Sequence, residues 1–229
     1  MRKIAVCLAT LLLGASSLFA QSPYDYAGRF YFSVQGGLAG TLSENVFSYT
    51  DNGKTMDLIK PQGSAAIGYD FNSYFGIRIS GAYAQHAGGS NVYDTTPKKD
   101  IWPFTYESVS AFADGVLNLS GLAENFGPFN PKLYAGIGGA YTYNFTNPNH
   151  PFQNPVNGNI VIGFRVGAIA EVDFRSGLGF FADLGLEAYD DWHSGIRPSE
   201  GDQKGFLGYA GFPFDLVGRL SLGIIYHFK

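Results

Sequence analysis

The sequence predicts an all-β fold, an eight-stranded antiparallel transmembrane β-barrel. Residues Phe214 to Phe228, FDLVGRLSLGIIYHF, place an apolar, aromatic or Gly residue at every second position. Successive side chains of a strand point to opposite faces, so one face would meet lipid and the other the lumen. The 229 residues include 20 Phe, 15 Tyr and 31 Gly, which is far from an average globular composition. Further alternating segments are separated by polar connections that are alternately short and long.

The first 20 residues have the pattern of a secretory signal peptide. Met1 to Lys3 form a short basic start, Ile4 to Leu13 are apolar, and Ala15 to Ala20 are rich in small residues. We expect cleavage after Ala20, which leaves residues 21–229 as one barrel domain. The alternative is an N-terminal anchor helix, which the small residues so soon after the apolar core disfavour. Cys7 is the one Cys of the chain, so the exported protein would have no disulfide, thiolate zinc site or Cys nucleophile.

The charge balance argues against a nucleic-acid partner. The chain has 15 Lys and Arg residues, two of which lie in the signal peptide, against 19 Asp and Glu residues. An acidic chain without a basic cluster lacks the electrostatic footprint of nucleic-acid binding. No apolar run after the signal peptide approaches the ~20 residues that a spanning helix needs. The longest candidate, Ile160 to Phe174, is interrupted by Arg165, Glu171 and Asp173.

The first four predicted strands each place apolar residues on one face and polar residues on the other. Their bounds are Arg29–Leu38, about Gly63–Phe71, Tyr74–Ala84 and about Glu107–Leu119. Their polar faces carry, in chain order, Ser33, Asp70, Arg78 and Asp114. The fourth strand alternates less cleanly, because Phe112 and Val116 share its polar side.

The last four predicted strands continue this pattern with more charge. Their bounds are Leu133–Tyr143, Ile160–Phe174, Leu178–Ala188 and Phe214–Phe228. Gly136, Gly138 and Gly139 lie within the fifth strand and precede no helix. We therefore interpret these glycines as relief for barrel curvature and not as a phosphate-binding loop.

The connections predict the orientation of the barrel. Asn72–Ser73 and Arg175–Gly177 are tight turns, and Ser120–Pro131 is a longer one. The other connections are long and polar: Thr41–Pro61, Gln85–Phe104, Asn144–Asn159 and Asp190–Phe212. Transmembrane barrels of this class have short turns on the periplasmic side and long extracellular loops. Trp102 and Trp192, near the loop bases, are interpreted as interface anchors in preference to a sugar-binding platform.

Two stretches carry a family resemblance. They are NLSGLAENFGPFNPKLYAGIGGAYTYNF, from Asn118 to Phe145, and the closing LSLGIIYHF. On the basis of these stretches, the mature chain resembles the small OmpA/OmpX-like outer-membrane β-barrels of Bacteroidetes-type bacteria, which are also called the porin family. Lys229 is a departure, because many members end on the aromatic residue itself. The chain also stops before the peptidoglycan-binding domain of full OmpA-type proteins, so we expect no anchoring through such a domain.

The resemblance implies a location and partners. The location is the outer membrane of a Gram-negative bacterium, and the contacts are with outer-membrane lipid and lipopolysaccharide. The closing strand would present a recognition signal to the barrel assembly machinery. The outward residues of this signal are Leu222, Ile224, Tyr226 and Phe228. We expect a monomer.

Charged residues on the predicted inward faces form the main candidate site. They are Arg78, Asp114, Arg165, Glu171, Asp183, Glu187, Asp215 and Arg219. Side chains can fill a barrel of about eight strands, and an unpaired buried charge is very costly. Neighbouring strands make Arg165, Asp183, Glu187 and Arg219 the expected network. We favour a salt-bridged plug that rigidifies the barrel over a gated ion path.

Histidines define the remaining candidates for chemistry. His86, His150 and His193 fall in predicted loops and His227 at the periplasmic end. Some small barrels modify lipid A acyl chains with Ser, His and a carboxylate. The only local grouping of this kind is His193-Ser194 with Asp190, Asp191 or Glu200, and such loop residues are usually just solvated. A metal site from His193 and Asp191 is no better supported. We predict no catalytic residue, cofactor or metal.

The expected function is structural and interactive, with the extracellular loops as the contact surface. A narrow pore with a charge-gated lumen is the alternative, and a lipid A acyl hydrolase or transferase is less favoured. A soluble β-sandwich is the alternative fold.

Overall fold

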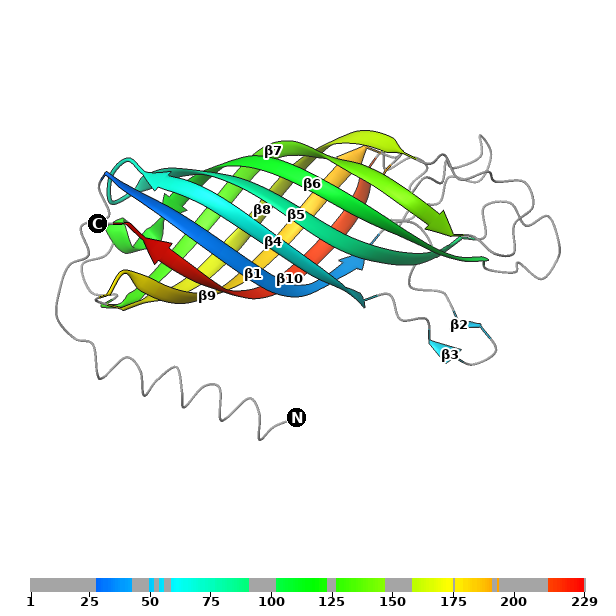
Figure 1. The fold of residues 1–229 in the computed structure, drawn as a ribbon, viewed down its shortest axis with the longest axis horizontal. Coiled ribbons are helices and arrows are strands. Elements are labelled where there is room, and N and C mark those ends of the chain that lie inside the picture. Colours follow the sequence, from blue (N-terminus) through cyan, green and yellow to red (C-terminus); the bar gives the residue numbers. More distant parts are fainter. Residues whose placement is uncertain are drawn as a thin grey trace.

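The chain folds as a β-barrel in a computed structural model that describes residues 28–42, 50–51, 54–55, 59–90, 102–122, 127–146, 158–174, 176–190, 193 and 214–228. The predicted signal peptide lies outside the described residues. Within them, the barrel is built from eight long strands (Figure 1). These are β1 (Arg29–Thr41), β4 (Ile59–Asp70), β5 (Phe75–Ser90), β6 (Trp102–Asn118), β7 (Phe129–Thr146), β8 (Asn159–Asp173), β9 (Leu178–Asp190) and β10 (Phe214–His227). A small hairpin of β2 (Thr50–Asp51) and β3 (Lys54–Thr55) precedes β4, and a 3-10 turn, η2 (Leu119–Leu122), follows β6.

Each long strand pairs antiparallel with its neighbours in the chain, and β10 returns to pair with β1. The closed order is β1-β10-β9-β8-β7-β6-β5-β4. The closing ladder runs from Tyr31 opposite His227 to Thr41 opposite Val217. The prediction of an eight-stranded antiparallel barrel is therefore confirmed. No helix in the described ranges is both long enough and apolar enough to cross a membrane.

Several strands extend further toward the long loops than predicted. β5 continues to Ser90 and β6 begins at Trp102. Both ends of the predicted loop Gln85–Phe104 are therefore paired strand. The prediction that His86 lies in a loop was wrong, because His86 sits in β5 and its side chain is buried. The apolar pattern ends where lipid would end, whereas ladder hydrogen bonds continue as long as two strands run side by side.

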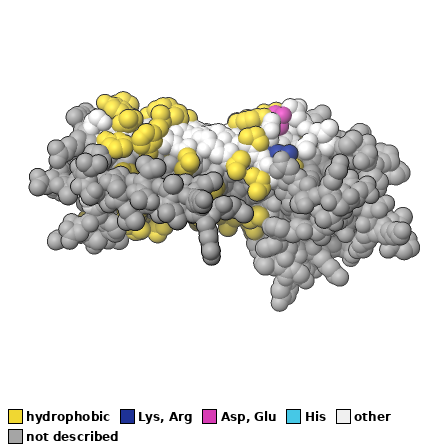
Figure 2. Space-filling model, turned by 90° about the horizontal axis from the view of Figure 1, so that it is seen from below, with side chains coloured by type: hydrophobic (Ala, Val, Ile, Leu, Met, Phe, Trp, Pro, Cys, Tyr) yellow, Lys and Arg dark blue, Asp and Glu magenta, His cyan; other side chains and the backbone are white. Residues whose placement is uncertain are grey.

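The two faces of the barrel differ in chemistry. Large apolar side chains point outward; Ile137 and Leu222, for example, are 63% and 68% exposed. Figure 2 shows hydrophobic side chains gathered in groups on one side of the barrel, with a hollowed surface between them. Exposed aromatic residues cluster at the short-turn end, where the rings of Tyr226 and Phe228 lie 5.2 Å apart. This apolar band with an aromatic rim is the surface expected of a barrel in lipid.

Inward-facing glycines make room for large lumenal side chains. A Cβ at Gly68 would overlap the ring of Tyr31, and a Cβ at Gly167 would overlap the ring of Tyr134. At Gly138, a Cβ would overlap the backbone oxygen of Ala111 on β6. Gly138, interpreted above as relief for curvature, thus also permits a close approach of backbone and ring.

Replacing an outward apolar residue at mid-barrel should weaken the protein in lipid. For Ile137→Arg we expect the free energy of unfolding to fall by about 2–4 kcal/mol, because a charge on the lipid face is costly at the bilayer centre. Reversible denaturant unfolding of barrels refolded into phospholipid vesicles measures this change.

The control is Thr105→Arg. Thr105 is exposed on β6 toward the loop end, where the cost should be roughly 0–1 kcal/mol. Equal losses in the two variants would contradict the placement of β7 in the hydrocarbon region.

Candidate functional site

The lumen of the barrel is filled by alternating charged and apolar layers. β8 shows the order from the short-turn end toward the loops: Asp173, Glu171, Ile169, Arg165 and Val161. All five side chains are buried. β10 repeats the order with a titratable residue, His227, then an apolar one, then Arg219, then another apolar one.

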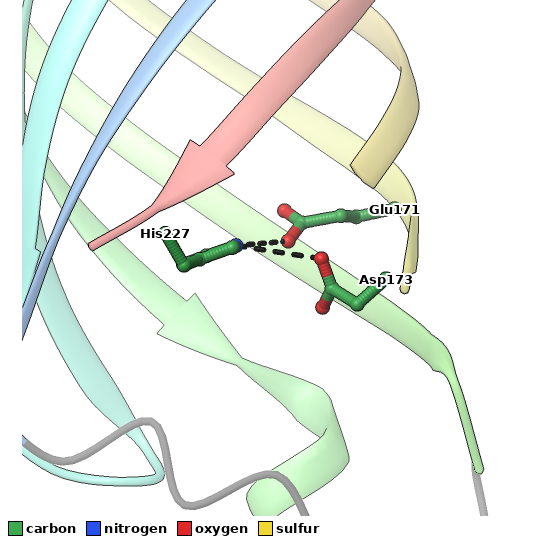
Figure 3. Close-up of side chains that lie close together, drawn as sticks. All are labelled: Glu171, Asp173 and His227. Atoms are coloured by element: carbon green, nitrogen blue, oxygen red, sulfur yellow. Dashed lines mark hydrogen bonds and ion pairs between the residues drawn. The ribbon is translucent and has the colours of Figure 1, made fainter. Parts of the chain in front are cut away.

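The first layer is a compact cluster at the short-turn end, which we call the Glu171–His227 cluster. It contains Glu171 and Asp173 on β8 and His227 on β10 (Figure 3), together with Lys132 on β7. His227 Nε2 lies 2.7 Å from Glu171 Oε1 and 3.4 Å from Asp173 Oδ1. Lys132 Nζ lies 2.8 Å from Glu171 Oε2. The cluster joins three strands across the end of the lumen.

An apolar layer separates this cluster from the next charges. Its members are Tyr31, Val116, Tyr134, Ile169, Phe181 and Ile225. Val116 belongs to the polar side of its strand, as the sequence pattern indicated. A lumenal cavity between this layer and its charged neighbours measures about 10 Å³, which is room for one water molecule.

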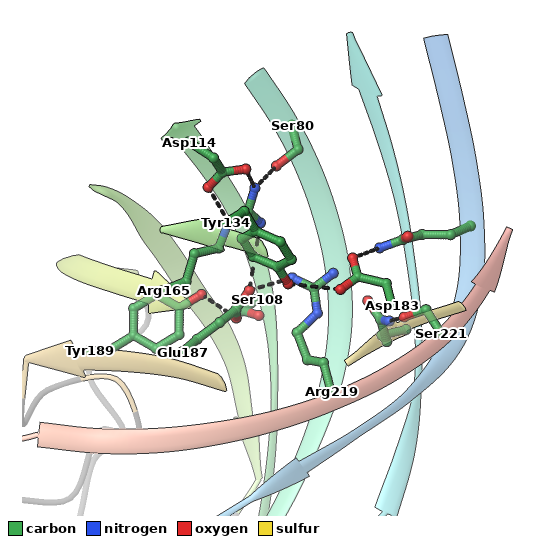
Figure 4. A network of polar contacts seen from close by, with 12 residues as sticks. Ser80, Ser108, Asp114, Tyr134, Arg165, Asp183, Glu187, Tyr189, Arg219 and Ser221 are labelled. Atoms are coloured by element: carbon green, nitrogen blue, oxygen red, sulfur yellow. Dashed lines mark hydrogen bonds and ion pairs between the residues drawn. The ribbon is translucent and has the colours of Figure 1, made fainter. Parts of the chain in front are cut away.

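Three arginines and three acids form the central network, and Figure 4 labels all of them except Arg78. Its members are Arg78, Asp114, Arg165, Asp183, Glu187 and Arg219, each at most 8% exposed. Asp114 accepts hydrogen bonds from two arginines. Arg78 Nε lies 2.8 Å from Oδ2 of Asp114, and Arg165 Nε lies 2.6 Å from Oδ1. Charge-assisted bonds of this kind are the stronger hydrogen bonds of proteins.

The other two acids of the central network are also paired. Arg219 binds Glu187, to which the Tyr189 hydroxyl donates a hydrogen bond of 2.7 Å. Asp183 accepts a hydrogen bond of 2.8 Å from the Tyr134 hydroxyl, and Arg78 Nη1 lies 3.8 Å away. With three positive and three negative groups, the central network can be neutral as a whole.

Aromatic rings cover the guanidinium groups of the central network. Arg78 Cζ lies 4.1 Å from the ring centroid of Tyr134, and Arg165 Cζ lies 4.5 Å from that of Phe112. Cation–π contacts gain strength when the cation is desolvated. The inward position of Phe112, which weakened the alternation of β6, therefore gives Arg165 a stacking partner.

Two further layers close the loop end. An apolar layer comprises Ala39, Ala84, Phe112, Ala140, Val161, Tyr189 and Val217. Tyr189 also contacts an aromatic cluster of buried residues that lies further toward the loops, His86, Tyr106 and His193. His193 stacks on Tyr189 at 4.1 Å, and its Nδ1 lies 3.0 Å from the Tyr106 hydroxyl.

The eight predicted lumenal charges all point inward and are buried, but they do not form one group. Six of them make up the central network. Glu171 belongs to the Glu171–His227 cluster instead. Asp215 is buried near the loop end of β10, opposite Tyr189 in the ladder. Arg165 lies closer to Asp114 than to Glu187, at 2.5 Å against 3.9 Å, although the expected network paired it with β9.

Lys132 is not among the predicted lumenal charges, and the sequence predicts no partner for Asp173 or His227. Lys132 stands one residue before the predicted start of its strand, and β7 begins earlier, at Phe129. Extending the alternation of this strand by one residue would have placed Lys132 inward. No sequence signal joins β8 to β10, because β9 lies between them in the sheet.

The remaining predicted residues divide between the outer surface and the loops. Outward positions on the closing strand are exposed at Leu222, Ile224, Tyr226 and Phe228. In the grouping considered for catalysis, Asp191, Ser194 and Glu200 lie outside the described residues, as does His150. His193 is fully buried.

No protein-family model and no curated protein matches this sequence. Similar solved structures exist. The outer membrane protein OprG of Pseudomonas aeruginosa is 11% identical over 89% of this chain and 98% of its own, with a TM-score of 0.52. This chain has the fold of the small outer-membrane β-barrels.

Two further solved structures match with lower TM-scores. A major outer membrane protein of Thermus thermophilus is 16% identical over 87% of this chain and 99% of its own, with a TM-score of 0.49. Neisserial surface protein A is 13% identical over 87% and 97%, with a TM-score of 0.46. The predicted resemblance to small outer-membrane barrels is confirmed at the level of the fold, and the Bacteroidetes type stays a prediction.

Removing the shared acid of the central network should strongly destabilise the barrel. In Asp114→Asn, Arg78 and Arg165 lose the carboxylate that both contact. We expect the free energy of unfolding to fall by about 3–5 kcal/mol, the usual cost of leaving a buried charge uncompensated. Denaturant unfolding of the refolded barrel gives the value.

Asp190→Asn is the matched control, because Asp190 is exposed at the end of β9. Its effect should stay within about 0.5 kcal/mol. If Asp114→Asn lowered the free energy of unfolding as little as this control, the two arginines would have to be stabilised by a group other than Asp114.

Proposed function

We propose that this protein is an integral outer-membrane barrel with a structural and surface-interaction role, whose lumen is a plug and not a passage. The central network is the observation that carries the proposal. Its six charged side chains are buried and paired across five strands. The fold shared with small outer-membrane barrels supports the location.

The physical argument concerns water. A hydrated ion needs a continuous polar path, whereas the lumen alternates between paired charges and apolar layers. The cavity beside the central network holds about 10 Å³, which admits one water but not a column of them. Opening such a path would require several charge-assisted bonds to break together.

The outer surface and the two ends of the barrel complete the proposal. The exposed apolar band suits outer-membrane lipid and lipopolysaccharide, and the protein inserts as a monomer. The outward residues of β10 present the closing strand to the barrel assembly machinery. A signal peptide, residues 1–20, exports the chain. The long loops that the sequence predicts form the contact surface for partners.

A narrow gated pore is the second candidate, and alternative partners within the central network favour it. Arg165 has Glu187 at 3.9 Å besides Asp114, and Arg78 has Asp183 at 3.8 Å. Each arginine could therefore exchange partners without leaving the network. We do not propose catalysis, because His193 is enclosed by the rings of Tyr106 and Tyr189.

Single-channel recording separates the two candidates. Residues 21–229, refolded into a planar bilayer, should give no discrete conductance steps. Heat-dependent gel mobility shows beforehand that the sample is folded. Discrete steps whose size or frequency changes in Arg219→Ala would contradict the plug and support a gated path through the central network.

A further inference from the structure

We propose that the Glu171–His227 cluster is a binding site for one divalent transition-metal cation of the zinc type. Glu171, Asp173 and His227 would be its protein ligands. The inference concerns the short-turn end of the lumen and does not depend on whether the lumen conducts.

The three side chains already converge on one point (Figure 3). Each offers one ligand atom, and these atoms all lie within 4.8 Å of one another. A tetrahedral Zn²⁺ with bonds of about 2.0–2.2 Å spaces its ligands roughly 3.4 Å apart. His227 Nε2 and Asp173 Oδ1 have this spacing, at 3.4 Å, and Glu171 Oε1 is closer to Nε2, at 2.7 Å. A small shift of the Glu171 side chain would admit the ion.

The charge of the surroundings points independently to a cation. Asp70 on β4 is fully buried at the same end of the lumen, and its Oδ2 accepts no hydrogen bond from the described residues. Its carboxylate interacts electrostatically with Lys132, His227 and Glu171. Three acids, Asp70, Glu171 and Asp173, therefore face two groups that can carry positive charge, Lys132 and, when protonated, His227. Buried charge is tolerated only when it is compensated. A divalent cation supplies the missing positive charge.

The donor set indicates the kind of ion. One imidazole nitrogen with carboxylate oxygens suits Zn²⁺ and its first-row neighbours, whereas Ca²⁺ and Mg²⁺ prefer oxygen ligands alone. The cation would take the position of the proton between His227 Nε2 and the carboxylates. Since β9 separates β8 from β10, the ion would fasten the closing strand across the lumen.

Lys132 allows a direct test of the proposal, because its ammonium group competes with the ion for the carboxylate of Glu171. Its Nζ lies 2.8 Å from Oε2 of Glu171, while Oε1 of the same carboxylate faces His227. In a metal site, the positive charge of Lys132 lowers the affinity for a cation, so its removal should raise the affinity. In a cluster built only of ion pairs, its removal would create no affinity.

The test titrates Zn²⁺ into the untagged barrel, residues 21–229, refolded in detergent after treatment with chelator. We expect one Zn²⁺ per chain to remain after desalting, and Co²⁺ to give the visible absorption bands of a tetrahedral site. His227→Ala and Asp173→Asn should each weaken binding at least about tenfold, and Lys132→Met should strengthen it by a similar factor. His193→Ala is the matched control, because it removes a buried histidine at the opposite end, and it should bind as the unaltered barrel does.

Failure to retain Zn²⁺, with no Co²⁺ bands, would overturn the proposal. Equal loss of binding in His193→Ala would do the same, because it would show scattered histidine binding. If His227→Ala does not fold by gel mobility, Asp173→Asn, which keeps the shape of the side chain, decides the matter. Unchanged Zn²⁺ affinity in Asp173→Asn and Lys132→Met would show that the cluster consists only of ion pairs and is not a metal site.

Discussion

Compensation of buried charge is the constraint on which this structure depends. An eight-stranded barrel has an interior that side chains must fill, and this chain fills it with Arg78, Arg165 and Arg219 among its acids. Each guanidinium is held by a carboxylate from another strand. Two contacts cross the lumen between strands that are not neighbours, Arg165 with Asp114 and Arg78 with Asp183. Removing one member would leave its partner charged and enclosed, which makes the network act as a unit.

The layers around the central network give it a dry environment. Apolar side chains lie on both sides of it, and rings such as Phe112 and Tyr134 lie against the guanidinium groups. Low water content strengthens each ion pair and also raises the cost of separating it. A lumen built in this way supports the proposed role of a rigid membrane element, in which contacts with other molecules would be made by the loops and the outer surface.

The sequence predicts the strands well because residues that face lipid are apolar, whereas residues that face the lumen are mostly polar or charged. Every second residue of β10 obeys this selection, and the inward charges on β8 and β9 were found by the same alternation. The alternation ends before the strands do, so the sequence predicts a loop at the outer ends of β5 and β6, including His86, where the structure has paired strand. Partners across the lumen could not be predicted, because the stagger of the closed barrel decides whether Arg165 meets Asp114 or Glu187.

A double-mutant cycle on Asp114 and Arg165 tests the central claim most directly. The free energies of unfolding of Asp114→Asn, Arg165→Met and the double variant are compared with that of the unaltered barrel in vesicles. If the lumen depends on compensated charge, the double variant should lose less than the two single losses together, with a coupling energy of about 1–3 kcal/mol. Additive losses, with a coupling energy near zero, would show that the two side chains merely occupy space in the lumen.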